Sequence, residues 1–429
     1  MAAAWASILI FLATFIAILT DRFHRTIVAW VGAATMVAAG LVLGFYTQGQ
    51  ALASIDFNTL GLLLGMMILM VMLSKTGFFE YLAVLAGRRS GGDPWRLLML
   101  LGGLTAFVSM FLNNLTVVIL IAPVTLVLAG MLRINPVPLL IGEALLSNIG
   151  GTATLIGDPP NTLIGSAANF SFNDFLPILL PIVLAAYYPT LWTLRRIFAA
   201  DMKRVSDQME TIHSLHPSDF IKDRPAMTKL LAVLGVVVGL FLLQDVVPLK
   251  PAYVAFAGAA LALLVIRPDP DALLKEIEWS ALLFFACLFV VVGGLEAAGV
   301  MKAAAAMVSG FAGSHLLLTA VLLIWVAAFL SAIVDNLPFA VAMVPIIKQL
   351  DSEGLHVEPL WWALALGVGF GGNGTPIGSM ANIIAISLSE QAGRPITFRM
   401  WLRSGAIATV VSCAVGTLAF LVIFGLIKN

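Results

Sequence analysis

Long apolar stretches alternate with short polar ones along almost the whole chain. A helix needs about 20 mostly apolar residues to span the hydrocarbon core of a bilayer. The first stretch lacks the basic start of a signal peptide, so we expect it to be retained as a helix. Eight stretches predict membrane-spanning helices: Trp5–Leu19, Ile27–Tyr46, Asn58–Ser74, Phe175–Leu194, Thr228–Leu243, Tyr253–Ile266, Ser280–Gly293 and Trp401–Ile427.

Other apolar segments are interrupted by polar residues near their middle. Trp95–Met131 is divided at Asn113-Asn114, which predicts two half-helices joined by a polar tip, as in a re-entrant hairpin. Val137–Gly165 contains the run GGTATLIGDPPN, which predicts a helix that unwinds midway. Irregular backbone at membrane depth is tolerated only where it is buried in protein or lines a cavity. These interruptions are therefore candidates for a functional site.

The interrupted segments are duplicated. AFVSMFLNNL at Ala106–Leu115 returns as AFLSAIVDNL at Ala328–Leu337, 222 residues later, with five of ten positions identical. GGTATLIGDPPN at Gly150–Asn161 returns as GGNGTPIGSMAN at Gly371–Asn382, with six of twelve identical. We therefore predict a second hairpin at about 315–350 and a second broken helix at about 360–390. Matching breaks in two halves of a membrane protein are typical of secondary transporters.

The repeat predicts the fold class and the domain organisation. The first repeat covers residues 1–200, a linker covers 201–227, and the second repeat covers 228–429. Each repeat would contain about five spanning helices, one of them broken, plus one re-entrant hairpin at about 95–131 or 315–350. An odd number of crossings turns the second repeat upside down relative to the first. The prediction is an all-α polytopic membrane protein built from two inverted-topology repeats.

The positions of Lys and Arg predict the orientation. Cytoplasmic loops of membrane proteins carry an excess of these residues. With the N-terminus outside, 19 of the 23 Lys and Arg residues fall in inner loops. This orientation places both termini outside the cell, and the first hairpin then enters from the cytoplasm while the second enters from outside. The two tips would meet the broken helices near the middle of the membrane.

Composition supports a membrane protein and excludes several other classes. Hydrophobic residues make up 61% of the chain and charged residues 11%, with a mean hydropathy of +1.03. Soluble domains carry about 25% charged residues. The net charge of zero does not favour nucleic acid as a partner, and no P-loop is present. The two cysteines have no metal-ligand spacing, and the methionine-rich run Gly65–Met72 is interpreted as packing, so we expect neither a metal nor a cofactor.

Uncharged polar residues at the tips and breaks are the candidate substrate ligands. They offer amide and hydroxyl groups, and the four repeated windows contain no Lys, Arg or His. A strongly anionic substrate would then need helix dipoles or a bound cation to balance its charge. The alternative is that the amides only cap half-helices. The candidate ligands are Asn113, Asn114, Thr116, Gly151, Thr152, Thr154, Asn161, Asn336, Asn373, Thr375, Ser379 and Asn382.

Three acidic residues are candidates for proton coupling. Acidic side chains within the membrane are costly and are functional hypotheses by default. Asp335 replaces Asn113 of the other repeat, and Asp158 replaces Ser379, so the repeated scaffold requires neither acid. The alternative is that each acid caps a half-helix. Glu143, in the first half of a broken helix, ranks below them because it is nearer the predicted cytoplasmic end.

An enzymatic function is not expected. Asp158 and Asp335 could in principle form the pair of an intramembrane aspartyl protease, and Gly157-Asp158 resembles part of such a motif. The partner Tyr-Asp motif is absent, so no catalytic residue is predicted. A passive channel would not require paired inverted hairpins.

These motifs resemble the ion transporter superfamily over nearly the whole chain. That superfamily includes arsenite efflux permeases, the P-protein family, sodium/proton antiporters and sodium–dicarboxylate carriers. GGTATLIGDPPN is similar to its broken-helix signature, and GDPPN is closest to the P-protein branch. Thr375-Pro376-Ile377-Gly378-Ser379 and Asn336-Leu337-Pro338 are similar to the arsenite permease pattern. The resemblance implies one central site between the hairpin tips and the broken helices.

The resemblance also implies a function. Dicarboxylate carriers usually have Ser-Asn-Thr at both tips, whereas this chain has Asn113-Asn114-Leu115 and Asp335-Asn336-Leu337. We therefore expect a bacterial inner-membrane exporter of arsenite and antimonite that exchanges them for protons. Family members can pair with a separate ATPase subunit. The alternatives are a sodium-coupled anion or dicarboxylate transporter and a sodium/proton antiporter.

Overall fold

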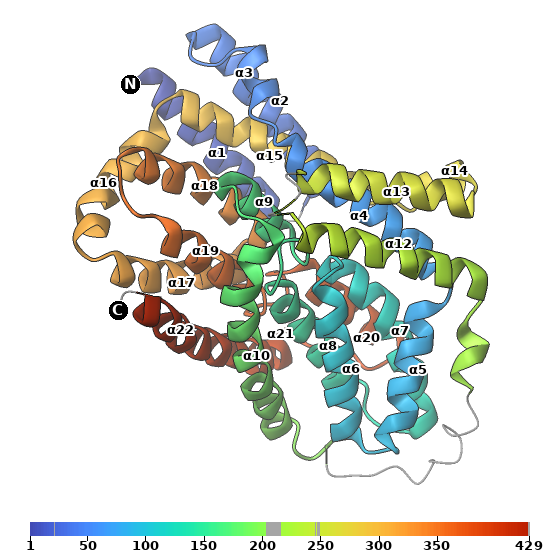
Figure 1. Ribbon diagram of the computed structural model, residues 1–429. Coiled ribbons are helices and arrows are strands. Elements are labelled where there is room, and N and C mark those ends of the chain that lie inside the picture. The colour runs from blue at the N-terminus through green and yellow to red at the C-terminus, as the bar shows by residue number, and fades with distance from the viewer. Residues whose placement is uncertain (21, 203–215, 245, 247–248, 428–429) are drawn as a thin grey trace.

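The computed structural model describes residues 1–20, 22–202, 216–244, 246 and 249–427, and these residues fold into helices joined by short connections, without strands (Figure 1). Residues 203–215 of the predicted linker lie outside the described residues. Nine helices in the described ranges are long and apolar enough to cross a membrane, and two of them are arms of the predicted hairpins. The all-helical, polytopic class predicted from the sequence is confirmed.

The helices of the first half include counterparts of four predicted spanning segments, both arms of the first hairpin and both parts of the first broken helix, together with two shorter helices that the apolar pattern did not predict, α3 and α5. The bounds are α1 (Ala2–Leu19), α2 (Arg25–Leu43), α3 (Gln48–Ala53), α4 (Phe57–Ser74), α5 (Phe78–Ser90), α6 (Pro94–Ser109), α7 (Asn114–Leu132), α8 (Val137–Gly151), α9 (Pro159–Ala168) and α10 (Phe172–Ile197).

The second half repeats this order of long and short helices after a 3-10 turn, η1 (Pro217–Phe220). A π-helical turn, η2 (Leu402–Ala406), precedes the last helix. The helices are α12 (Arg224–Leu242), α13 (Pro251–Ile266), α14 (Pro270–Leu274), α15 (Trp279–Ala297), α16 (Val300–Ser314), α17 (Leu316–Ile333), α18 (Asn336–Ser352), α19 (Glu358–Gly371), α20 (Met380–Gln391), α21 (Phe398–Trp401) and α22 (Ile407–Ile427).

Two equivalent glycines begin the short helices that precede each hairpin. Gly77 lies before α5 with φ of +82°, and Gly299 lies before α16 with φ of +77°. Residues other than glycine rarely adopt this left-handed conformation. The chain turns sharply at both positions, and this explains why the sequence repeats a glycine there.

Helices of the two halves pack against each other crosswise. α2 packs on α15 and α4 packs on α13, so each pair contains one helix from each half. The hairpins are crossed in the same way, because α20 lies against α7 and α9 lies against α18 (Figure 1). The central site is therefore assembled from both halves.

The most buried helices are the first halves of the two broken helices. Every residue of α8 is buried, and so is almost every residue of α19, whereas α1 is largely exposed on its outer face. Close backbone contacts hold α8 and α19 to the hairpins: a Cβ at Gly150 would lie 2.2 Å from the Ala106 carbonyl oxygen, and one at Gly371 would lie 2.5 Å from Ala328 Cα. Glycine at these positions lets the hairpin and the broken helix touch.

Candidate functional site

The two hairpin tips differ in how their first residue is used. Asn113 is the N-cap of α7, and its Oδ1 accepts a hydrogen bond from the Leu115 amide at 3.2 Å. Asp335 is the N-cap of α18, but its carboxylate makes no side-chain capping bond. Its Oδ2 instead lies 2.6 Å from Nη1 of Arg25, the first residue of α2. A substitution between equivalent positions has thus changed a helix cap into an ion pair.

The unwound segments of the broken helices are held by equivalent asparagines. Asn161 Nδ2 donates to the carbonyl oxygens of Thr152 and Thr154, both at 2.9 Å. Asn382 Nδ2 donates to the carbonyl oxygens of Gly372 and Thr375, at 2.7 and 2.9 Å. Buried carbonyls without partners are costly. The amide hydrogens of these two asparagines therefore stabilise the unwound backbone.

Hydroxyl groups join each unwound segment to the hairpin of its own repeat. Thr154 donates to the Met110 carbonyl at the end of α6, and Thr375 donates to the Ala332 carbonyl near the end of α17. Ser109 donates to the Ser147 carbonyl at 2.7 Å. The pattern is repeated in both halves, which indicates that these hydroxyls position the hairpins.

Asn148 of α8 lies at the junction between the two repeats, and sequence reasoning missed it. Its Oδ1 accepts from Asn114 Nδ2 at 2.8 Å and from Ser379 Oγ at 2.9 Å. Its Nδ2 donates to Asn373 Oδ1 at 2.8 Å and to Asn382 Oδ1 at 3.2 Å. All four hydrogen-bonding positions of the amide are occupied. The first hairpin is thereby joined to the second broken helix through one side chain.

No repeated motif marks Asn148, because the residue 221 positions later is Gly369. A Cβ at Gly369 would lie 2.0 Å from Thr152 Oγ1, so that position has no room for a side chain. The available signal was an asparagine next to Ser147 in a mostly apolar helix, two residues before Gly150.

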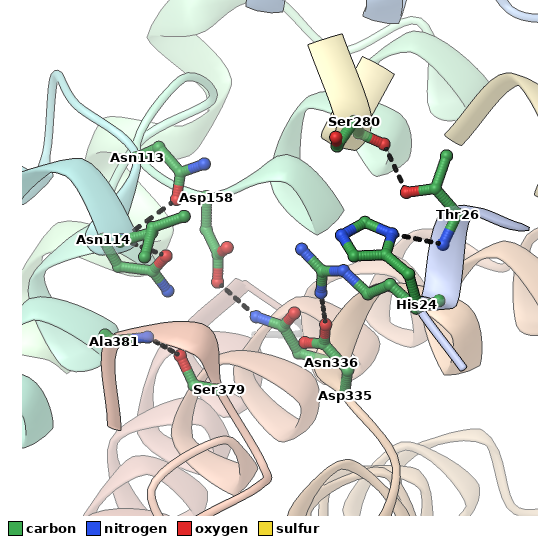
Figure 2. A network of polar contacts seen from close by, with 12 residues as sticks. His24, Thr26, Asn113, Asn114, Asp158, Ser280, Asp335, Asn336, Ser379 and Ala381 are labelled. Atoms are coloured by element: carbon green, nitrogen blue, oxygen red, sulfur yellow. Dashed lines mark hydrogen bonds and ion pairs between the residues drawn. The ribbon is translucent and has the colours of Figure 1, made fainter. Parts of the chain in front are cut away.

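Asp158 is a buried carboxylate with only one hydrogen-bonded oxygen (Figure 2). Its side chain is 2% exposed, and its Oδ2 accepts from Asn336 Nδ2 at 2.9 Å. Its Oδ1 is buried and has no hydrogen-bond partner among the residues that the structure describes. Although Asp158 is the N-cap of α9, it makes no side-chain capping bond, whereas the equivalent Ser379 accepts one from the Ala381 amide at 3.3 Å.

Asp158, Asp335 and both tips line one small cavity of about 30 Å³. A cavity of this size accommodates water or a small ion. Arg25 supplies positive charge there, and Glu278, the N-cap of α15, supplies a third carboxylate. Glu278 lies outside the four repeated windows but matches Asp56 at the same offset of 222 residues, and sequence reasoning missed both Arg25 and Glu278 as site residues. The predicted site residues that line this cavity are Asn113, Asn114, Asp158, Asp335, Asn336 and Ser379.

The remaining predicted residues surround the cavity or lie elsewhere. Thr116 Oγ1 donates to Glu278 Oε1 at 3.1 Å. Glu143 is fully buried on α8, accepts a hydrogen bond from Thr125 of α7, and has its other oxygen, Oε2, buried without a partner. Residues that do not line the cavity are Thr116, Glu143, Gly151, Thr152, Thr154, Asn161, Asn373, Thr375 and Asn382.

Larger cavities lie on either side of the hairpin tips. One of about 250 Å³ is lined by methionines of α4 and shares Asn113 and Glu278 with the small cavity. Another of about 480 Å³ is lined by α15 and α18 and contains Asp56, the repeat equivalent of Glu278. Within the described residues, no group of three or more His, Cys, Asp or Glu side chains is placed to hold a metal ion.

Comparison with known proteins identifies the family. The model of the citrate transporter family (CitMHS) matches residues 15–367. A 46 kDa membrane protein of Mycobacterium leprae is 40% identical over 95% of this chain and 96% of its own length. An uncharacterized transporter of Mycobacterium tuberculosis is 37% identical over 96% of both chains.

Two further comparisons extend this finding. The human P protein is 33% identical over 94% of this chain, which corresponds to 58% of the P protein. The YdaH transporter of Alcanivorax borkumensis, whose structure is described as having an unusual topology, matches with a TM-score of 0.62 over 98% of both chains at 12% identity, which shows a shared fold. The resemblance to the ion transporter superfamily and its P-protein branch is confirmed, and so is the expectation of a transporter rather than an enzyme. The chain is a multi-pass membrane transporter that belongs to the citrate transporter family.

Proposed function

We propose that this protein is a secondary active transporter that moves a small polar solute in exchange for protons, around the cavity between the hairpin tips. The observation that carries the proposal is that two acidic side chains, Asp158 and Asp335, line the same cavity. Among the described residues, one buried oxygen of Asp158 has no hydrogen-bond partner, and Asp335 is paired with Arg25. Each acid stands where the other repeat has an uncharged residue, because Asp335 is equivalent to Asn113 and Asp158 to Ser379. The two halves of the site therefore differ in charge.

Proton uptake follows from the cost of burying charge. A buried carboxylate without a counter-charge is expensive, and binding a proton removes that cost. Asp158 accepts one hydrogen bond, from the neutral amide of Asn336, so no ion pair within the described residues offsets its charge. Asp335 can exchange its bond to Arg25 for a proton. Both groups therefore offer sites for a coupling proton next to the proposed substrate.

For the substrate we propose arsenite or antimonite, exported across a bacterial inner membrane with both termini on the outer side. As(OH)₃ is neutral near pH 7 and offers hydroxyl groups to amides and carboxylates. Asn113, Asn114, Asn336 and Ser379 present such groups around the cavity. Exchange for protons would let the membrane potential drive export of a neutral solute, with or without a separate ATPase subunit.

The test is metalloid transport in inverted membrane vesicles with an imposed pH gradient. Wild-type protein should accumulate arsenite when the interior is acidic, and Asp335→Asn and Asp158→Asn should each reduce gradient-driven transport roughly tenfold or more, since removing a buried charge changes energies by more than ~1.4 kcal/mol. Asp351→Asn, at the exposed end of α18, is the matched control. Arsenite transport no faster than in empty vesicles would reject the proposed substrate. Full proton coupling in both variants would show that Asp335 and Asp158 do not carry the coupling proton.

A second candidate is sodium-coupled transport of a carboxylate anion. Two observations favour it: the description of the family as citrate transporters, and the guanidinium of Arg25 in the cavity. Arginine matches carboxylate groups in geometry and charge. Sodium-dependent uptake of citrate or dicarboxylates in proteoliposomes, without arsenite transport, would favour this candidate. Sodium-induced proton movement with neither solute present would instead indicate a sodium/proton antiporter.

A further inference from the structure

The first turns of α2 and α15 form a unit beside the cavity. The two helices pack together, and Thr26 Oγ1 donates to the Ser280 carbonyl at 2.9 Å (Figure 2). Each helix belongs to a different repeat, and neither is part of a hairpin or a broken helix. Their starting ends carry Arg25 and Glu278.

This unit makes one polar contact with each hairpin. Arg25 Nη1 lies 2.6 Å from Asp335 Oδ2 at the tip of the second hairpin. Glu278 Oε1 accepts from Thr116 Oγ1, in the first turn of the first hairpin's α7, at 3.1 Å. The Arg25 and Asp335 side chains are 22% and 19% exposed, so water screens their pairing only in part. The guanidinium also lies 5.1 Å from the centre of the Phe284 ring.

The repeat equivalent of the Glu278–Thr116 contact is not formed in the other half. Asp56, the repeat equivalent of Glu278, accepts from Thr59 Oγ1 at 2.5 Å and from the Asn58 amide at 3.0 Å, and so caps its own helix, α4. The residue equivalent to Thr116 is Pro338, which has no side-chain donor. The duplicated scaffold therefore holds the hairpin tips asymmetrically.

We infer that Arg25 is a positioning residue that locks the second hairpin to the scaffold while Asp335 is charged, and that proton uptake by Asp335 releases this lock. Arginine does not lose its proton in proteins, so the state of the pair is set by the carboxylate. Within the described residues, the charged side chains that line the cavity with Asp335 are Arg25 from α2, Asp158 before α9 and Glu278 before α15. After Asp335 is neutralised, Glu278 remains as an anionic partner for Arg25. The inference rests on the proposed proton coupling at Asp335.

The lock can be tested without a substrate, by hydrogen–deuterium exchange in lipid nanodiscs at pH 7. Arg25→Gln and Asp335→Asn should each speed amide exchange in residues 330–340 roughly tenfold, and the double variant no further, because both remove the same contact. Arg25→Lys, which retains the charge, should lie between wild type and Arg25→Gln. Arg25 donates its hydrogen bond to Asp335 rather than to the tip of the first hairpin, residues 110–116, so exchange at that tip should be unchanged.

The control variant is Arg22→Gln, which removes an exposed positive charge three residues before Arg25 and should alter neither tip. The reverse pattern is expected for Glu278→Gln, which should loosen residues 110–116 more than residues 330–340. The lock would be rejected if the increases in exchange rate caused by Arg25→Gln and Asp335→Asn add in the double variant. It would also be rejected if the exchange rate rises equally at both tips, which would indicate general destabilisation.

Transport supplies a second readout. Without its cation, Asp335 holds a proton more readily, so in Arg25→Gln the pH of half-maximal gradient-driven transport should move upward by about one unit or more. If no proton-coupled transport is found but exchange behaves as expected, the proposed function fails and the lock stands. If transport is proton-coupled and the pH profile of Arg25→Gln matches wild type, the lock is rejected and the function stands.

Discussion

Asn114 at the tip of the first hairpin donates a 2.8 Å hydrogen bond to Asn148, which in turn binds three polar side chains of the second broken helix. Replacement of Asn148 by alanine would leave one polar group on each of its four partners without its hydrogen bond: Asn114 Nδ2, the Ser379 hydroxyl hydrogen, Asn373 Oδ1 and Asn382 Oδ1. Unpaired buried polar groups cost about 1–3 kcal/mol each. Asn148→Ala should therefore lower the thermal unfolding midpoint and abolish transport.

Differential scanning fluorimetry in detergent measures the unfolding midpoint of Asn148→Ala, and a vesicle assay measures its transport. Gln349→Ala, which removes a half-buried amide of α18 whose hydrogen bond to Glu353 is exposed to solvent, is the control and should leave both unchanged. Wild-type transport in Asn148→Ala would show that the amide junction is dispensable.

Alanine at Gly150 should separate the first hairpin from its broken helix. The added Cβ would lie 2.2 Å from the Ala106 carbonyl oxygen, closer than real Cβ contacts, so the backbones of α6 and α8 must move apart. We expect at least ~2 kcal/mol of destabilisation, as in other overpacked cores. Gly371→Ala should behave similarly.

The matched control is Gly130→Ala in α7, where a Cβ would meet nothing within 4 Å. Alanine favours helix over glycine by about 0.5–1 kcal/mol, so this variant should be neutral or slightly stabilised. Unfolding midpoints of the three variants give the comparison, and equal midpoints for Gly150→Ala and Gly130→Ala would contradict it.

Asp158→Asn should separate proton coupling from solute movement. The asparagine retains an oxygen that can accept from Asn336 but cannot exchange a proton, so transport should become insensitive to pH while solute still moves down its own gradient. Counterflow of labelled solute at pH 6 to 8 measures this. A variant that still concentrates solute against its gradient would exclude Asp158 as a carrier.

Glu143→Gln should have little effect on coupling. Glu143 does not line the central cavity, and its hydrogen bond from Thr125 can be accepted equally by a glutamine oxygen. We expect transport within about twofold of wild type and an unchanged pH profile, because the glutamine amide has a similar volume and accepts the same hydrogen bond. A pH profile that flattens as in Asp158→Asn would instead assign a proton site to Glu143.

The predicted orientation can be tested by labelling cysteines in the two larger cavities. In a Cys287→Ser, Cys413→Ser background, Ser74→Cys lines the cavity next to Asn113, and Lys348→Cys lines the opposite one. A membrane-impermeant maleimide should label Ser74→Cys in inverted vesicles and Lys348→Cys in intact cells, because the positive-inside rule places these cavities on opposite sides. Labelling of both positions from one side would reject the orientation.

The apolar pattern was sufficient to predict the helical class, the hairpin interruption at Asn113-Asn114 and the unwound stretch before Asp158. These features depend on local chemistry: apolar runs form helices in lipid, and glycine, proline and asparagine interrupt them wherever the backbone can find other partners. The repeat also indicated which positions differ between the halves. Asp335 and Asp158 were singled out for that reason, and both line the central cavity.

The partners of those acids depend on the tertiary fold. Arg25 reaches Asp335 across 310 positions of the chain because α2 packs on α15 of the other half, and Asn148 meets four polar side chains because α8 packs against both α7 and α20. Because the four repeated segments contain no Lys, Arg or His, the sequence did not predict that a guanidinium lines the site. Local sequence dictates where a membrane helix starts, breaks and ends, but the charge balance of a buried site is the sum of side chains that only packing brings within a few ångströms.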